Sequence, residues 1–61
     1  LSDLRRLRQK IGEEGVEVAL AEGRDELIAE SADLVFHLLL YLHSQGISWG
    51  EIMAELERRR A

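Results

Sequence analysis

The chain has 61 residues, of which 12 are acidic and 8 are basic, so its formal net charge at pH 7 is −4. It has no cysteine, which excludes disulfide staples and is compatible with the cytoplasm. No basic stripe outweighs the acids, and the apolar run Leu34–Leu42 is far shorter than the roughly 20 residues of a membrane span. We therefore expect no nucleic-acid partner, no membrane segment, and a single cytoplasmic domain over residues 1–61. A domain of this size needs oligomerisation, a metal or further residues for stability.

The first predicted helix runs from about Asp3 to Glu22, with Ser2 as its N-cap. Its apolar residues recur at three- and four-residue steps and form one seam: Leu4, Leu7, Ile11, Val18 and Ala21. Glu14 occupies the position that continues this seam. Because a buried carboxylate is costly unless it is paired or binds a metal, Glu14 is a candidate functional residue. We interpret the flanking Gly12 and Gly15 as room for a second backbone or a ligand beside the acids.

The second predicted helix starts near Asp25, as its cap, and ends near Gln45; Gly23 and Gly46 stop the first and second helices. One face carries an acidic stripe that ends in a histidine: Glu26, Glu30, Asp33 and His37. Most of the remaining circumference is apolar, with the residues Leu27, Ile28, Ala32, Leu34, Val35, Leu38, Leu39 and Leu42. A helix that is apolar on several sides is buried on several sides. Two other short helices cannot cover it, so we expect a partner subunit.

A third helix is predicted after Ser48, which forms an S-x-x-E capping box with Glu51. Glu55 and Arg59 can pair at i,i+4, and the arginines at the end suit the helix dipole. The predicted fold is therefore all-α. It is an antiparallel helical hairpin plus a third C-terminal helix, dimerising into a helical bundle.

Four carboxylates lie at matched distances on either side of the turn at Gly23. Glu17 and Glu30 are each about 10 Å from it at 1.5 Å per residue, and Glu14 and Asp33 are each about 14 Å from it. A hairpin would bring these like charges together, and such a cluster needs a cation. The second helix has no Lys or Arg from residue 26 to residue 45, so pairing within that helix is excluded. All-oxygen ligands select a hard cation, so we expect Mg²⁺, with Mn²⁺ as the alternative.

Two segments resemble the signatures of phosphoribosyl-ATP pyrophosphatases. Residues 10–17, KIGEEGVE, match K-x-x-E-E-x-x-E, and residues 30–37, ESADLVFH, match E-x-A-D-L-x-Y-H. The C-terminal residues 46–58 are also similar to that family. The E-x-x-E and E-x-x-D pairs alone are shared with the broader all-α nucleoside triphosphate pyrophosphohydrolase superfamily.

The resemblance implies Mg²⁺-dependent hydrolysis of phosphoribosyl-ATP to phosphoribosyl-AMP and pyrophosphate, the second step of histidine biosynthesis, by a homodimer or higher homo-oligomer. It also implies roles for particular side chains. The metal ligands would be Glu14, Glu17, Glu30 and Asp33. The catalytic residues would be Glu13, as a supporting acid or water-orienting base, and Glu14. The substrate-binding residues would be Lys10, which would contact phosphate, and His37.

The chain departs from the family pattern at two points. Phe36 stands where Tyr is common, and an N-terminal segment rich in Ser, Thr and Lys, which helps to close the substrate site in the family, has no counterpart here. Two alternatives stay open from the sequence. One is a related enzyme acting on canonical or modified nucleoside triphosphates, and the other is a non-catalytic helical dimerisation module.

Overall fold

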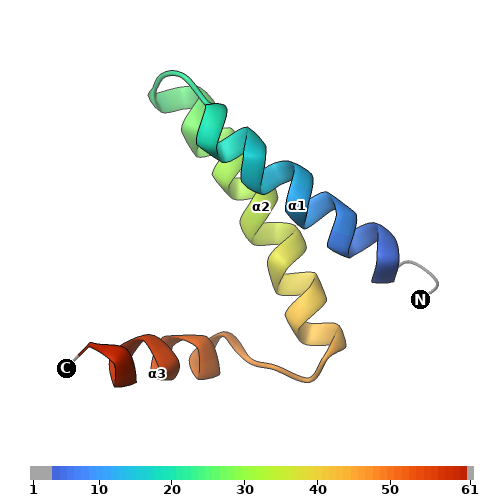
Figure 1. The fold of residues 1–61 in the computed structure, drawn as a ribbon, viewed down its shortest axis with the longest axis vertical. Helices are drawn as coiled ribbons and strands as arrows, with labels where there is room; N and C mark the ends of the chain where they lie inside the picture. The colour runs from blue at the N-terminus through green and yellow to red at the C-terminus, as the bar shows by residue number, and fades with distance from the viewer. Residues whose placement is uncertain (1–3, 61) are drawn as a thin grey trace.

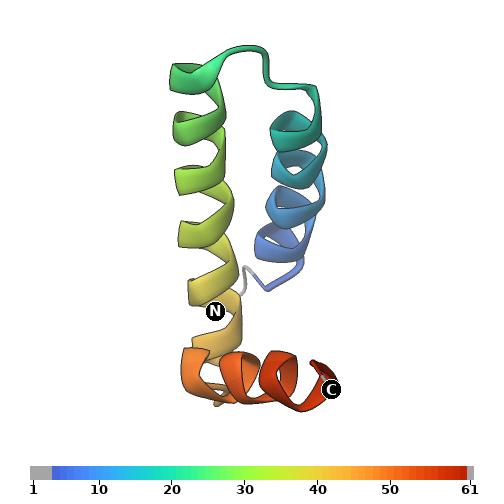
Figure 2. The ribbon, with the colours of Figure 1, turned by 90° about the vertical axis from the view of Figure 1, so that its left-hand side faces the viewer.

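The computed structural model describes residues 4–60 (Figure 1). Within this range the chain forms three helices and no strand: α1 (Leu4–Leu20), α2 (Arg24–Ser44) and α3 (Trp49–Arg59). α1 and α2 lie side by side as an antiparallel hairpin, and α3 projects across the far end of α2 (Figures 1 and 2). The prediction of an all-α hairpin with a third helix is confirmed.

The turn between α1 and α2 differs in detail from the sequence prediction. α1 ends at Leu20, two residues early, and Gly23 is the N-cap of α2 rather than the left-handed cap of α1. Its φ of 91° and ψ of 159° are open to glycine, which lacks the Cβ that restricts other residues. Asp25 lies inside the first turn of α2, where its charge complements the helix dipole, so its assignment as the cap is wrong. The predicted cap Ser2 lies outside the described residues.

The end of α2 is closed by two backbone hydrogen bonds. The N–H of Ile47 donates to the carbonyl of Leu42 at 2.9 Å, and the N–H of Gly46 donates to the carbonyl of His43 at 3.0 Å. This pair of bonds is the Schellman motif, and Gly46 adopts the positive φ, 72°, that the motif requires. The predicted stop at Gly46 is confirmed.

The start of α3 is fixed by the predicted capping box. The Ser48 hydroxyl accepts a hydrogen bond from the N–H of Glu51 at 3.2 Å, and the Glu51 carboxylate accepts one from the N–H of Ser48 at 3.0 Å. At the other end of α3, Glu55 pairs with Arg59 at 2.9 Å and also with Arg58. Because α3 makes few contacts with α1 or α2, it is stabilised mainly by these local bonds.

The face of α1 that packs on α2 is the predicted seam. Its half-buried members are Leu7, Ile11, Val18 and Ala21. Glu14 sits in their midst with only 5% of its surface exposed, and it is the most buried residue of the described chain. From α2, Leu34, Leu38 and Tyr41 are half-buried against this seam. The carboxylate of Glu14 therefore lies in the interface between the two helices, as the periodicity of α1 predicted.

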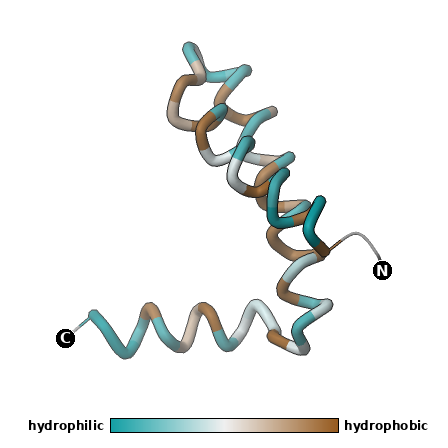
Figure 3. Tube along the Cα trace, turned by 45° about the vertical axis from the view of Figure 1, so that its right-hand side comes forward, coloured by the Kyte–Doolittle hydropathy of each residue, from teal (hydrophilic) through white to brown (hydrophobic). Residues whose placement is uncertain are grey.

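The hairpin has no hydrophobic core of its own within residues 4–60, because no hydrophobic side chain there is buried. The hydrophobic residues along α2 and α3 (Figure 3) include these large exposed ones: Leu27, Ile28, Val35, Phe36, Leu39, Leu40, Trp49, Met53 and Leu56. The chain exposes 5059 Å². A folded monomer of 7.0 kDa should expose roughly 4,000 Å², so about 1,000 Å² of surface is left to be covered.

α2 is also long and apolar enough to cross a membrane when judged by length and composition alone. The sequence argument considered only the run Leu34–Leu42, whereas an 18-residue window within α2 meets that criterion. Glu30 and Asp33 lie within this helix, and each charged carboxylate would cost about 2.5–3.5 kcal/mol at the centre of a bilayer. A second helical surface would cover the apolar residues and leave these acids at its edge. We therefore interpret α2 as a helix-packing element.

The space at the two glycines beside Glu14 is open within the hairpin. A Cβ at Gly12 or Gly15 would meet no atom of the described chain within 4 Å. At 3.6 residues per turn, Gly12 lies about 140° around α1 from Glu17, on the opposite flank. No second backbone approaches these glycines within the hairpin. The open space lies on the flank away from Glu17, where a second subunit could pack.

Candidate functional site

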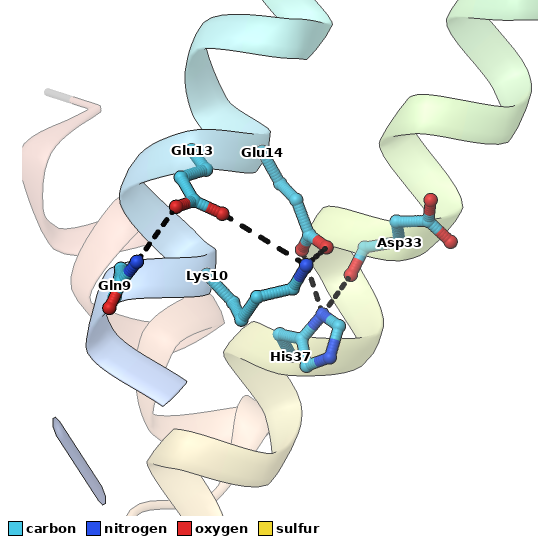
Figure 4. A network of polar contacts seen from close by, with 6 residues as sticks. All are labelled: Gln9, Lys10, Glu13, Glu14, Asp33 and His37. Carbon is cyan, nitrogen blue, oxygen red and sulfur yellow. Dashed lines mark hydrogen bonds and ion pairs between the residues drawn. The ribbon is translucent and has the colours of Figure 1, made fainter. Parts of the chain in front are cut away.

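The buried carboxylate of Glu14 contacts a histidine of the facing helix. Its Oε1 lies 2.8 Å from Nδ1 of His37, and its Oε2 lies 3.9 Å from Nζ of Lys10 (Figure 4). The weak Lys10 contact is an i,i+4 pair within α1, whereas the His37 contact links residues 23 positions apart. The structure thus compensates the buried charge with polar partners from both helices, as burial requires.

His37 is held with Nδ1 toward Glu14. The same nitrogen lies 3.2 Å from the backbone carbonyl of Asp33, one turn earlier on α2. A carboxylate and a carbonyl both accept hydrogen bonds, so Nδ1 carries the proton and donates to them. The ring of Phe36 meets the His37 ring edge to face at 5.1 Å between centroids. These contacts orient the imidazole, and through it the Glu14 carboxylate.

A second contact, closer to the turn, joins Glu17 of α1 to Glu30 of α2. The pKa of Glu30 is raised above its usual 4.5, first by a hydrogen bond with Glu17, then by desolvation and by the charges of Glu17, Asp33 and Glu26. Two carboxylates can share a hydrogen bond only if one of them holds a proton. We call Glu17, Glu26, Glu30 and Asp33 the acidic cluster. The negative charges of its other three members favour the protonated form of Glu30.

The four predicted metal ligands therefore divide into separate contacts. Glu17 and Glu30 meet, as their matched distances from the turn predicted. Glu14 is turned to His37, and the carboxylate of Asp33 points away from Glu14 (Figure 4). Within residues 4–60, no group of three or more His, Asp or Glu side chains converges closely enough to hold a metal ion. The expectation that all four acids would meet in one cluster is not met by these side-chain orientations.

Glu13, the predicted supporting acid, lies on the exposed side of α1. Its Oε2 accepts a hydrogen bond from Nε2 of Gln9 at 2.9 Å, and its Oε1 lies 4.0 Å from Nζ of Lys10. Lys10 therefore stands between the carboxylates of Glu13 and Glu14 (Figure 4). A lysine held this loosely between two acids is available to bind an anionic group.

A pocket that the sequence did not reveal opens beside these residues. It has a volume of about 280 Å³ and is lined by Arg6, Leu7, Lys10, His37 and Leu40. Lys10 and His37 were predicted to bind substrate from the motifs, and the pocket brings them together. Arg6 belongs to no motif. Its one signal in the sequence is its spacing of four residues from Lys10, which places the two on one face of α1.

Comparisons with known proteins place the chain in a family. Residues 1–60 match the family model described as phosphoribosyl-ATP pyrophosphohydrolase. The chain is similar to the phosphoribosyl-ATP pyrophosphatase of Pyrobaculum islandicum, with 51% identity over 61 residues, 95% of this chain and 65% of that protein. It is similar to the same enzyme of Pyrobaculum aerophilum, with 55% identity over 56 residues, 87% of this chain and 60% of that protein.

The chain also resembles part of a longer protein. It is 48% identical over 58 residues to the histidine biosynthesis bifunctional protein HisIE of Haemophilus influenzae. The matched region covers 90% of this chain and 26% of that protein. No solved structure matches the chain. The chain spans less than two thirds of the length of each of these relatives. From the match over residues 1–60, the chain belongs to the phosphoribosyl-ATP pyrophosphohydrolase family.

Proposed function

We propose that the protein hydrolyses phosphoribosyl-ATP to phosphoribosyl-AMP and pyrophosphate in histidine biosynthesis, with Mg²⁺ as its cofactor. Family membership supports the reaction, and the observation that carries the site is the buried Glu14 carboxylate, one turn along α1 from Glu17. The neighbouring acids raise the pKa of Glu30. A hard divalent cation bound among these carboxylates would offset their mutual repulsion.

The acidic cluster fits Mg²⁺ in its donor atoms. Glu17 and Glu30 already meet, and the charges of Asp33 and Glu26 act on Glu30. Mg²⁺ prefers carboxylate oxygens and keeps several waters, so a pair of acids with further acids nearby suits it better than a closed cage. Glu17, Glu30 and Asp33 would hold the ion, and Glu14 would join them by exchanging its His37 contact for the metal. When bound, Mg²⁺ would neutralise charge on the phosphate oxygens and activate water.

The surrounding side chains have roles that follow from their contacts. Glu13 is an exposed carboxylate held by Gln9, and it can take a proton from an attacking water. Lys10, close to Glu13 and Glu14, can donate to a phosphate oxygen and stabilise its charge. His37 holds Glu14 through the 2.8 Å contact until a metal binds. Together these groups support attack of water on the bond between the α- and β-phosphates.

The acids can be tested by measuring pyrophosphate release from phosphoribosyl-ATP with Mg²⁺. We expect the native protein to be active, and Glu14→Gln and Asp33→Asn each to lose most of that activity. Glu57→Gln is the matched control, since Glu57 is an exposed acid of α3 that pairs with Arg60 at 3.3 Å. Activity at the native level in either site variant would refute the metal-ligand assignment.

Two further measurements separate the proposal from its rivals. Hydrolysis of dCTP or dUTP in preference to phosphoribosyl-ATP would identify a nucleoside triphosphate pyrophosphohydrolase of different substrate. A non-catalytic dimerisation module predicts no thermal stabilisation by Mg²⁺ or Mn²⁺. A rise in melting temperature with either metal would count against that module, because a ligand that binds only the folded state stabilises it.

We also propose that two copies of the chain associate through the apolar face of α2 and α3. The support is the absence of any buried hydrophobic side chain in residues 4–60 and the surplus of about 1,000 Å² of exposed surface. A stable interface buries roughly 600–1,000 Å² on each partner, which matches this surplus. The exposed residues Val35 and Leu39 lie on the flank of α2 opposite to the acidic cluster. Such a dimer would leave both acidic clusters accessible.

A further inference from the structure

The pocket beside the acidic cluster has a cationic rim and an apolar wall. Arg6 and Lys10 are one turn apart on the same face of α1, and Leu7 and Leu40 line the pocket with them. Arg6, Leu7 and Lys10 place it toward the start of α1, away from the turn between α1 and α2. Its volume of about 280 Å³ is below the roughly 300–1,000 Å³ of pockets that enclose whole small-molecule ligands. It therefore suits one phosphate group with an attached sugar better than a complete nucleotide.

The pocket and the acidic cluster share one flank of the hairpin. At 3.6 residues per turn, Arg6, Lys10 and Glu17 fall on one side of α1. His37, Asp33 and Glu30 fall on one side of α2, and the two sides are the same flank because Arg6, Lys10 and His37 line one pocket. This flank is basic toward the start of α1 and acidic toward the turn. A ligand lying along it would meet a cationic pocket and a metal-attracting cluster in succession.

The spacing suits a ligand with two separate anionic groups. Arg6 and Glu17 are 11 positions apart, which is about 16 Å along α1 at 1.5 Å per residue. Phosphoribosyl-ATP carries a triphosphate on one ribose and a 5′-phosphate on a second ribose, with the adenine between them. The triphosphate needs the metal, whereas the 5′-phosphate needs direct cationic donors. ATP and other ordinary nucleoside triphosphates lack the second group.

We propose that Arg6, together with Lys10, binds the 5′-phosphate of the second ribose and so selects phosphoribosyl-ATP over ordinary nucleoside triphosphates. This assignment rests on the proposed function of the acidic cluster. The planar guanidinium of Arg6 matches phosphate oxygens in pairs, and Lys10 adds a second charge one turn away. Leu7 and Leu40 give the sugar an apolar surface to lie against. Arg6 is thus a specificity-determining residue outside the family signatures.

Kinetics of Arg6→Gln against Arg8→Gln test this assignment. Both variants remove one positive charge from α1, but Arg8 does not line the pocket. We expect Arg6→Gln to raise KM for phosphoribosyl-ATP about tenfold, the loss of one hydrogen bond to a charged group, with kcat changed less than twofold. Ribose 5-phosphate should inhibit the native enzyme competitively, and its inhibition constant should rise about tenfold in Arg6→Gln. The inhibition constant of pyrophosphate should be the same in Arg6→Gln as in Arg8→Gln. Equal effects on both inhibitors, or kinetics for Arg6→Gln that match Arg8→Gln, would overturn the assignment.

A binding measurement separates this assignment from the reaction itself. Ribose 5-phosphate should shift the amide resonances of Leu7, Lys10 and Leu40 in the native protein and in Arg8→Gln. In Arg6→Gln the same shifts should need about tenfold more ribose 5-phosphate. These shifts without hydrolysis of phosphoribosyl-ATP would refute the proposed reaction and retain the phosphate pocket. The absence of shifts in a protein that hydrolyses phosphoribosyl-ATP would refute the pocket and retain the reaction.

Discussion

Glu14 and His37 form the central polar contact of the hairpin, with Oε1 and Nδ1 at 2.8 Å between α1 and α2. The carboxylate is buried in the apolar seam, and the imidazole is partly buried, with 22% of its side chain exposed. The contact closes a loop of 23 residues and fixes the relative register of the two helices. It also defines a resting position from which Glu14 would turn toward a metal.

Removal of His37 should therefore destabilise the protein. We expect His37→Ala to lower the free energy of unfolding by about 1–3 kcal/mol, because it leaves the buried Glu14 carboxylate with only the distant Lys10 ammonium. His43→Ala, at the exposed end of α2, is the control. Urea titrations of both variants at pH 7 provide the comparison. An effect of His37→Ala no larger than that of His43→Ala would show that the contact contributes nothing to stability.

The raised pKa of Glu30 predicts how pH acts on the acidic cluster. Because the folded-state pKa lies above the usual 4.5, Glu30 takes up its proton in the folded protein before it does in the unfolded chain as the pH falls. Its stabilising contribution is complete below pH 4.5 and is lost as the pH rises through the folded-state value.

Carboxyl-carbon NMR titrations of Glu30 can check this prediction. Glu17→Gln should lower the pKa of Glu30 toward its usual value, because it removes the largest cause of the shift. Mg²⁺ should lower it in the native protein and have a smaller effect in Glu17→Gln. Glu22→Gln is the control, since Glu22 is not among the groups that act on Glu30. The same pKa in native and Glu17→Gln proteins would rule out the contact.

Gly12→Ala should stabilise the protein without harming the site. Alanine is about 1 kcal/mol more favourable than glycine inside a helix, and a Cβ at Gly12 meets open space. We expect a gain of about that size in the free energy of unfolding, with pyrophosphate release unchanged, since Gly12 faces away from Glu17. Chemical denaturation and the release assay measure the two effects. Loss of activity by an intact dimer would mean that a ligand occupies the space at Gly12.

A charge in the apolar face of α2 should prevent self-association. Leu39 is 42% exposed in the single chain, and we expect Leu39→Lys to convert a dimer into a monomer because a buried unpaired charge is costly. Sedimentation of the native protein and the variant reports the oligomeric state. Arg8→Lys, which keeps the charge of an exposed site on α1, is the control. A Leu39→Lys protein that sediments like the native dimer would place the interface elsewhere.

The sequence predicted those features that depend on short-range patterns. Apolar residues at three- and four-residue steps identified the packing face of α1 and marked Glu14 as anomalous, and the structure buries that residue. The signals at Gly46 and Ser48 predicted the end of α2 and the start of α3, because both motifs are closed by bonds between neighbouring residues. Such interactions follow from the local sequence alone.

The features that the sequence did not predict depend on side-chain orientation between helices. Equal distances from the turn placed Glu14 level with Asp33, but Glu14 is turned to His37 and Asp33 points outward. The pocket at Arg6 was missed because its walls come from both helices and Arg6 belongs to no motif. Gly23 was expected to end the first helix, but it is the N-cap of α2. A glycine with positive φ is compatible with both positions, which differ in ψ.

The corner between α2 and α3 has a consequence for association. Four residues, 45–48, join the helices, and the bonds that hold them come from Leu42, His43, Ser48 and Glu51, all within the same short segment. These local hydrogen bonds therefore fix the direction of α3 in the single chain. A helix that is already ordered loses little conformational entropy on binding, so more of the energy from burying Trp49, Met53 and Leu56 would remain as affinity. A chain whose residues 4–60 bury no hydrophobic side chain could in this way keep a well-defined surface for its partner.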